Sequence, residues 1–551
     1  MTAGSERRLH IALAVAVGIC FLGVLLGTTS ELGYARDEGF YFFAARKYET
    51  WFSLLSSDRA FALKRQQVDH AWSVNHEHPG LIKSLFALSH LKLQASSRWF
   101  AETGTSFRFP AMCFAALGVA ITTLWAMRRV GLIAGLVAGL SLAFMPRVFF
   151  HAHLACFDVP ITAMFVLTFL AFDKALSSEG PAFPLLTGVL FGLALDTKHN
   201  AWFLPIAFLF HGLLTLLAAR VVRRSLWRAV RRHVHVLVAM AILGPAVLIA
   251  CWPWLWFDTL ARFKAYASFH LNHDYYNMEF LGETYFQPPM PRLYAPLMSL
   301  ATVPFITIAL GCVGALHFVR ALIVDIRERE RDLVERHRTL LSWVIGVGVS
   351  YGPWLSTSTP IFGGTKHWMP AYPFIALLAG YGFQKAASAL AAELRRIEKP
   401  RLAIAVAPAL GLLVLASPIE QALRAHPWGL SAYTPIVGGA TGAATLGLNR
   451  GFWGYTTGSV TDVLNKAPKG ALVYPHDTAA SSWDMLREDG RIRPDLRATW
   501  RVEDATISLY HHEMHMQGEE YQAWIALGTV SPVAVRGLDG VPVIWVYQRK
   551  K

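Results

Sequence analysis

The sequence predicts a mainly helical, polytopic membrane protein with about eleven transmembrane helices and a small soluble domain at its C-terminal end. Apolar residues make up 54% of the 551 residues and charged residues only 16%, whereas soluble domains usually have roughly 45–50% and about 25%. The apolar residues also gather in runs long enough to cross a bilayer. This composition excludes a disordered chain, a disulfide scaffold and an ordinary cytosolic enzyme.

The first apolar run, residues 9–26, follows Arg7 and Arg8 and has no small-residue cleavage site before Glu31. We therefore interpret it as a signal anchor and not as a cleaved signal peptide. Ten further runs are predicted to span the membrane, and the shortest of them is 183–197. They lie at about 105–127, 130–149, 157–176, 183–197, 200–219, 234–255, 295–319, 339–356, 367–387 and 401–421.

The loops between these runs predict the orientation. Alternation of sides places the Arg-rich segments 220–232 and 320–338, with six Arg each, on the same face as the N-terminus. The positive-inside rule makes that face cytoplasmic, in a plasma (inner) membrane. The net charge of +14 then reflects topology, so we expect the lipid bilayer and no nucleic acid as a partner.

The opposite, extracytoplasmic face carries the larger loops. We expect a transmembrane domain over residues 1–425, whose first outer loop (about 30–104) has amphipathic stretches that could lie along the interface. Residues 430–551 are expected to form a periplasmic α/β or α+β domain without a nucleotide-binding motif. Its predicted strands are 471–474, 506–510, 533–536 and 541–547, with helices near 479–488 and 519–527 and a turn at Asp539-Gly540.

Five polar segments fall on this outer face. For two of them, 35–41 and 151–160, a structural explanation is equally open, since an acid at the start of a helix caps it and interacts well with its dipole. The convergence of all five on one side of the membrane instead indicates a site. The segments are 35–41 with adjacent Asp37 and Glu38, 75–80 with His76 and His78, 151–160 with Asp158, 196–200 with Lys198, and 363–370 with Lys366.

The order of these segments resembles the GT-C superfamily of membrane glycosyltransferases, near the protein O-mannosyltransferase and lipid A aminoarabinose transferase group. The resemblance covers residues 9 to about 390, and the acidic pair in its context is its most specific part. It rests on Asp37-Glu38 with Phe40-Tyr41, Glu77-His-Pro79, Arg108-Phe-Pro110, Asp158, Gly192 to Lys198, Pro253-Trp254, and Lys366 with Pro370-Ala-Tyr-Pro373.

The resemblance implies transfer of a sugar from a polyprenyl-phosphate donor to the hydroxyl of a glycan, lipid or protein acceptor. It implies Asp37 as general base, Glu38 as helper or acceptor ligand, and Asp158 as orienter or metal ligand. The leaving phosphate would be bound by cations, for which the candidates are Lys366, Lys198, His78 and Arg292, with Arg262 as the alternative to Arg292. His78 stands where aminoarabinose transferases carry Lys, and a neutral imidazole supplies no fixed positive charge.

The sequence indicates no certain cofactor, although a divalent metal ion could bind at the outer face. Outer-face histidines could supply ligands together with Asp158 or Glu77, and the candidates are His76, His78, His151 and His153. The segment His511-His-Glu-Met-His515 does not predict a zinc protease, because that motif requires two residues between the Glu and the second His.

Two other function classes remain open from the sequence. A transporter or permease of a lipid-linked or sugar substrate would usually place charges near the bilayer midplane and often has internal repeats, whereas here the charges cluster at one interface. A non-catalytic receptor would bind its ligand through the 430–551 domain.

Overall fold

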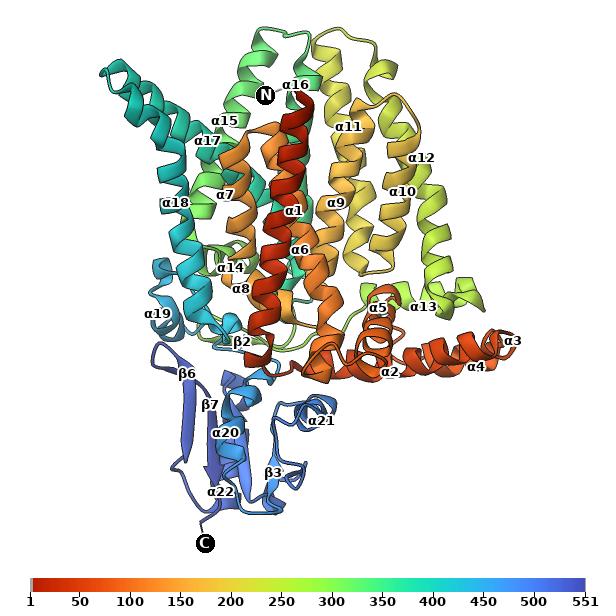
Figure 1. The fold of residues 1–551 in the computed structure, drawn as a ribbon, viewed down its shortest axis with the longest axis vertical. Coiled ribbons are helices and arrows are strands. Elements are labelled where there is room, and N and C mark those ends of the chain that lie inside the picture. Colours follow the sequence, from red (N-terminus) through yellow and green to blue (C-terminus); the bar gives the residue numbers. More distant parts are fainter. Residues whose placement is uncertain (1–2, 551) are drawn as a thin grey trace.

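The computed structural model describes residues 3–550 and shows a long helical bundle with a small mixed domain against one end (Figure 1). We call the end next to this domain the outer end. The opposite end carries the N-terminus and the Arg-rich segments 220–232 and 320–338, and we call it the basic end. The bundle consists of α1 (Ala3–Thr28), α6 (Thr103–Arg129), α7 (Leu132–Ala143), α8 (Pro146–His153), α9 (Asp158–Ser177), α10 (Ala182–Leu195), α11 (Phe203–Val221), α12 (Leu226–Cys251), α15 (Phe305–Arg327), α16 (Leu333–Tyr351), α17 (Tyr372–Arg396) and α18 (Pro400–Ala425).

The helices confirm a polytopic, mainly helical membrane protein, but not the number of eleven spans. In the described residues, eight helices are long and apolar enough to cross a membrane: α1, α6, α9, α11, α12, α15, α17 and α18. A ninth span exists if the bent pair α7 and α8 counts as one. Helix α10 has only 14 residues, and α16 is not among the helices that are long and apolar enough to cross a membrane.

Proline explains two of the differences from the predicted spans. The predicted run 130–149 is divided into α7 and α8, which meet at an angle of 64°, because Pro146 begins a new helix. The predicted run 295–319 is divided into α14 (Tyr294–Thr302) and α15, with Pro304 as the N-cap of the second helix. Apolar composition alone does not predict where a proline divides an apolar run into two helices.

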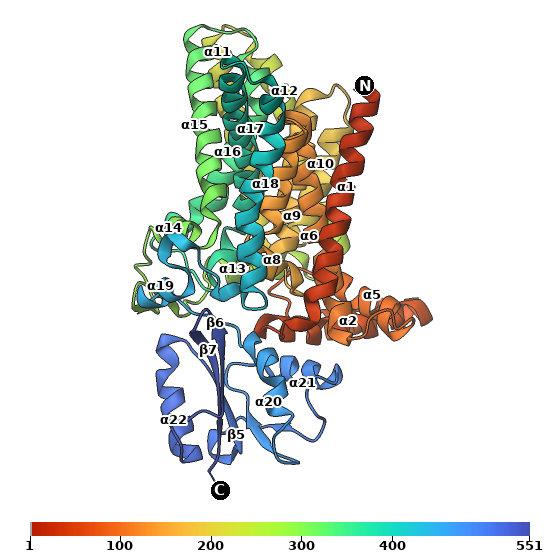
Figure 2. The same ribbon diagram turned by 60° about the vertical axis from the view of Figure 1, so that its left-hand side comes forward.

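The first outer loop lies across the outer end of the bundle (Figures 1 and 2). It contains α2 (Arg36–Ser57), α3 (Arg59–Ala62), α4 (Arg65–Trp72) and α5 (Leu81–Ser89), followed by a π-helical turn. Aromatic packing joins α2 to α4, with the rings of Tyr48 and Trp72 stacked at a centroid distance of 4.0 Å. These helices therefore form one packed layer across the outer end of the bundle.

The C-terminal part contains a five-stranded mixed sheet in the order β4-β3-β5-β7-β6. Strand β3 (Leu472–Tyr474) runs parallel to β4 (Arg497–Ala498) and β5 (Ile507–His511), and β7 (Val541–Gln548) runs antiparallel to β5 and β6 (Ala534–Leu538). Helices α20 (Thr461–Leu464), α21 (Ala480–Glu488) and α22 (Gln517–Leu527) complete it. The expected strands and helices are confirmed, and the two-residue β4 is the strand that the sequence did not indicate.

Contacts around the start of α2 hold the C-terminal part in place. The Tyr34 hydroxyl donates to the Asp489 carboxylate, and the Arg491 guanidinium donates to the Leu32 carbonyl at 2.6 Å. Gly33 is required there, since a Cβ would lie 1.9 Å from the Tyr455 carbonyl oxygen. The sheet domain is thereby fixed against residues 32–35, directly before the predicted acidic pair.

Candidate active site

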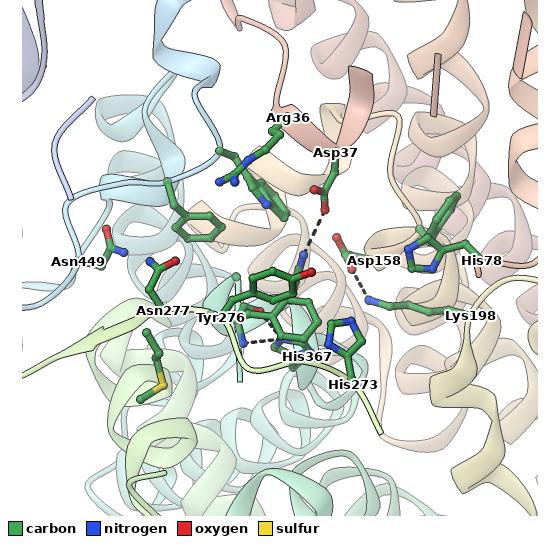
Figure 3. A pocket seen from close by; sticks show the side chains of 18 of the residues that line it. Arg36, Asp37, His78, Asp158, Lys198, His273, Tyr276, Asn277, His367 and Asn449 are labelled. Carbon is green, nitrogen blue, oxygen red and sulfur yellow. Dashed lines mark hydrogen bonds and ion pairs between the residues drawn. The ribbon is translucent and has the colours of Figure 1, made fainter. Parts of the chain in front are cut away.

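A cavity of about 480 Å³ opens at the outer end of the bundle (Figure 3). All five polar segments singled out in the sequence contribute to its wall, so the predicted convergence is present in the fold. Further wall residues come from the loop after α13 (Thr259–Leu271) and from the segment between α18 and the sheet domain. Representatives of the five segments are Asp37, His78, Asp158, Lys198 and Lys366.

Asp37 lies in the first turn of α2, where the helix dipole favours a negative charge. Its Oδ2 lies 3.2 Å from the Nζ of Lys366. Lys366 also lies 4.3 Å from the centre of the Trp453 ring, a cation–π contact. Gly363 allows this arrangement, because it has a left-handed φ of 69° and a Cβ there would lie 2.4 Å from Cε of Lys366.

A second acid–lysine pair lines the same cavity. The Lys198 Nζ donates to Oδ1 of Asp158 at 2.6 Å, and both side chains are more than 90% buried. The Nδ1 of His151 lies 3.6 Å from the other carboxylate oxygen. Figure 3 shows Asp37 and Asp158 directed toward the same space from α2 and α9. Two carboxylates and two ammonium groups thus converge there.

Glu38 is directed away from this space. Its Oε1 accepts from Nε of Arg108 at 2.7 Å and from the Ala155 amide at 2.9 Å. Its Oε2 accepts from Nη2 of Arg108 at 2.8 Å and from the Ala35 amide at 2.9 Å. Consecutive residues of a helix point about 100° apart, so Asp37 faces the cavity while Glu38 is fully buried behind it. The expected role of Glu38 as helper or acceptor ligand does not fit this position; it anchors α2 to α6.

His78 lines the cavity, but it is not a permanent cation. Burial lowers the pKa of His78 well below its ordinary value, and Lys83 adds to the effect, so the imidazole is neutral at neutral pH. Lys83 is a residue that the sequence did not single out. Its ammonium donates to the carbonyls of Asn75 at 2.5 Å and His78 at 3.0 Å, which holds this loop against α5, while burial lowers its pKa to about 7.

Arg292 does not reach the site, since it is exposed and lies outside the cavity wall. Two arginines that the sequence did not indicate line the cavity instead. Arg36 pairs with Asp477 of the C-terminal part at 3.2 Å. Arg147, from α8, is 97% buried, and within residues 3–550 its Nε and Nη2 have no hydrogen-bond partner. An arginine with free buried donors facing a cavity is suited to bind an anion.

The four histidines expected at a metal do not form a ligand set. His76 is exposed and bonds to the Ser73 carbonyl at 2.7 Å. His153 lies between the Thr28 hydroxyl and the Phe149 carbonyl, each at 2.8 Å. His78 lines the cavity, whereas His151 lies beside Asp158 at 3.6 Å on a different segment and is not part of the cavity wall. Their short spacing in the sequence predicts shared metal ligation, but the fold does not bring the four imidazoles together.

The described residues contain another group suited to a divalent metal ion. Ligand atoms of Glu279, Glu513 and His515 all lie within 4.8 Å of one another, and both carboxylates are almost fully buried. Burial, together with Asp477 and Glu279, raises the pKa of Glu513 to about 8. The sequence did not reveal this group, because Glu279 lies in the hairpin β1 (Met278–Phe280) and β2 (Glu283–Tyr285), far from the other two residues.

Comparison with known proteins agrees with the resemblance expected from the sequence. Residues 90–252 match the model of the dolichyl-phosphate-mannose-protein mannosyltransferase family, which confirms the resemblance over that part of the chain. This segment includes Arg108, Arg147 and Asp158 together with Lys198. No curated protein matches the chain.

Two solved structures match this chain over most of its length at low sequence identity. ArnT from Cupriavidus metallidurans, bound to undecaprenyl phosphate, is 17% identical with a TM-score of 0.47 and coverage of 97% of both chains. The archaeal oligosaccharyltransferase AglB from Archaeoglobus fulgidus, in complex with an inhibitory peptide and a dolichol-phosphate, is 10% identical with a TM-score of 0.49, covering 95% of this chain and 71% of that one.

Proposed function

We propose that this chain is an integral membrane glycosyltransferase that moves a sugar from a polyprenyl-phosphate donor to an acceptor hydroxyl at the outer end of the bundle. The observation that carries the proposal is the pairing of Asp37 with Lys366 and of Asp158 with Lys198 in one cavity. The carboxylates can accept a proton and the ammonium groups supply fixed positive charge, all in the wall of the same cavity. The family match over residues 90–252 supports it.

In the proposed reaction the acceptor oxygen attacks the anomeric carbon of the donor sugar. A new carbon–oxygen bond forms while the bond between that carbon and the lipid phosphate oxygen breaks. The bonding pair leaves with the phosphate, and the acceptor proton moves to the carboxylate of Asp37, the general base. Asp37 suits this role because it is the acid of α2 that lines the cavity, whereas Glu38 lies outside the wall and is bonded to Arg108 and to backbone amides.

The cations of the cavity would stabilise the leaving phosphate. Lys366, Lys198 and Arg147 line the wall, and charge placed where the transition state develops it lowers the barrier. Arg147 is the strongest phosphate ligand of the three, since its unpaired donors can bind two oxygens at once. Asp158 would then act through Lys198 by fixing the ammonium group in the cavity wall.

Several finer features belong to the same proposal. The basic end is cytoplasmic by the positive-inside rule, so the cavity and the C-terminal domain would lie on the extracytoplasmic side of an inner membrane. The transferred group would be a hexose or pentose, and the acceptor a glycan, lipid or protein hydroxyl. The wall includes the aromatic residues Tyr41, Phe157 and Trp453, which suit the apolar face of a sugar ring.

The experiment uses the purified full chain in liposomes with a panel of radiolabelled polyprenyl-phosphate sugars, and it measures release of free polyprenyl phosphate. We expect release from one donor with the wild type and its loss in Asp37→Asn. The matched control is Asp274→Asn, since Asp274 is an exposed acid on the same face outside the cavity wall. No release with any donor would overturn the proposal, and equal loss in both variants would overturn the role of Asp37.

A further inference from the structure

A second cavity, of about 500 Å³, is lined mainly by residues of α11, α12, α16 and the loop that joins α11 to α12. The ends of these helices lie at the basic end of the bundle (Figure 1). It lies at the other end of the bundle from the candidate active site, and the proposed sugar transfer makes no use of it. Its wall carries four arginines and two histidines but only one carboxylate, that of Glu335. The basic residues are Arg224, Arg228, Arg232, Arg338, His211 and His233.

Two of these four arginines, Arg228 and Arg232, have no acidic partner among the described residues. Nη1 of Arg224 donates to both oxygens of Glu335 at 2.5 and 2.6 Å, so these two charges neutralise each other. Arg232 donates only to backbone carbonyls, those of Glu179 and Gly180. In the described chain, the Arg228 side chain has neither an ion pair nor a hydrogen bond. A polar cavity with uncompensated charge favours an anion.

Buried groups of the same wall also lack partners. His233 is 96% buried, and its Nδ1 has no hydrogen-bond partner within residues 3–550. Its Nε2 lies 2.9 Å from Nδ1 of His211, whose own Nε2 lies 3.1 Å from the Arg338 carbonyl. The Nε of Arg338 forms an ion pair with Asp173 at 3.6 Å but has no hydrogen-bond partner within residues 3–550. Buried polar groups are normally satisfied, so these atoms indicate a ligand.

The surroundings of the cavity indicate where the ligand comes from. Exposed apolar side chains flank it on the ends of α11 and α12, namely Leu217, Val221, Leu226 and Trp227. Tryptophan with aliphatic residues beside arginine is typical of the headgroup level of a bilayer. Basic pockets between transmembrane helices on the cytoplasmic side bind phosphate headgroups, and the planar guanidinium fork matches phosphate oxygens.

We propose that this cavity binds a phosphate group, through Arg228 and Arg338 with His233 behind them. The phosphate belongs either to the headgroup of an anionic phospholipid or to free phosphate ion, and the flanking apolar side chains favour the lipid. The site is independent of the proposed sugar transfer, since it lies at the opposite end of the molecule and shares no wall residue with the first cavity.

The test measures ligand binding to the delipidated full chain by native mass spectrometry. Three probes are compared: dioctanoyl phosphatidylglycerol, dioctanoyl phosphatidylcholine and inorganic phosphate. We expect phosphatidylglycerol to bind in preference to phosphatidylcholine. Arg228→Gln is expected to weaken that binding about tenfold or more, since it removes a charge-assisted hydrogen bond to the phosphate. Arg231→Gln is the matched control, because Arg231 is exposed on the same helix outside the wall.

Competition distinguishes the two sources and does not depend on the variants. If inorganic phosphate binds alone and displaces the lipid, the ligand is the phosphate ion. If only phosphatidylglycerol binds, the ligand is the lipid headgroup. Equal binding of both lipids without any phosphate binding would overturn the proposal, as would equal weakening by Arg228→Gln and Arg231→Gln, which would indicate a diffuse surface charge.

Discussion

The substitution Glu38→Gln separates the structural role of Glu38 from the catalytic role of its neighbour Asp37. Glu38 is fully buried and accepts hydrogen bonds from two guanidinium nitrogens and two backbone amides. A glutamine side chain keeps the shape but places an NH₂ group against one set of these donors. It also leaves the charge of Arg108 without its carboxylate partner in the protein interior.

The size of the expected loss in unfolding free energy follows from these contacts. Removal of one partner of a buried ion pair costs about 3–5 kcal/mol. The loss of unfolding free energy for Glu38→Gln should lie in that range, because Arg108 keeps the Thr29 and Gly33 carbonyls and one amide oxygen as acceptors but no negative charge. The control is Arg46→Ala. Its exposed ion pair with Glu488 also joins α2 to α21, but such surface pairs contribute about 0–1 kcal/mol.

The assay is unfolding of the detergent-solubilised protein followed by tryptophan fluorescence, together with the lipid phosphate release described above. We expect a clearly lower unfolding midpoint for Glu38→Gln than for Arg46→Ala. If Glu38→Gln unfolds as the wild type does but no longer transfers sugar, the reasoning is refuted and Glu38 takes part in the chemistry.

Three further predictions concern the cavity and its surroundings. Arg147→Gln should weaken binding of polyprenyl phosphate about tenfold or more, since a charged hydrogen bond is worth about 1.5–3 kcal/mol; unchanged affinity in a binding titration would exclude Arg147 as a phosphate ligand. Gly363→Ala should also weaken that binding, because its Cβ would displace the Lys366 side chain and the left-handed φ disfavours alanine, whereas a wild-type affinity would mean that the position of Lys366 is unimportant. The pKa of Glu513 rises to about 8 on folding from an ordinary value of 4.5, so the folded state binds more protons between these values and, in EDTA, its stability should fall as pH rises from about 5 to about 8. Glu513→Gln should remove that dependence when thermal unfolding is measured, and the same pH dependence in both proteins would disprove the assignment to Glu513.

The sequence could predict the helices and the convergence of polar segments, because both follow from local patterns. Apolar runs identify helices, and the side of the membrane on which a loop lies follows from alternation and charge. These patterns identify four residues that line one cavity: Asp37, Asp158, Lys198 and Lys366. The pairing of each acid with a particular lysine was not predictable, since it depends on the packing of α2 and α9 against distant loops.

The residues that the sequence did not indicate are those whose partners lie far along the chain. Arg147 lies in α8, whose separation from α7 depends on Pro146. Glu279 and Glu513 are 234 positions apart and meet only through the hairpin after α13. Adjacency in sequence predicts Glu38 beside Asp37 in the site, but the helical rotation between consecutive residues separates the two side chains.

The central claim is that Asp37 accepts the acceptor proton while the cations of the cavity bind the donor phosphate. The most direct measurement compares donor binding and sugar transfer in Asp37→Asn, in the same liposomes and with the same polyprenyl-phosphate sugar. The account predicts that donor binding persists while transfer falls about 100-fold or more, the usual effect of losing a general base. Transfer at the wild-type rate, or loss of donor binding without any change in the chemical step, would contradict it.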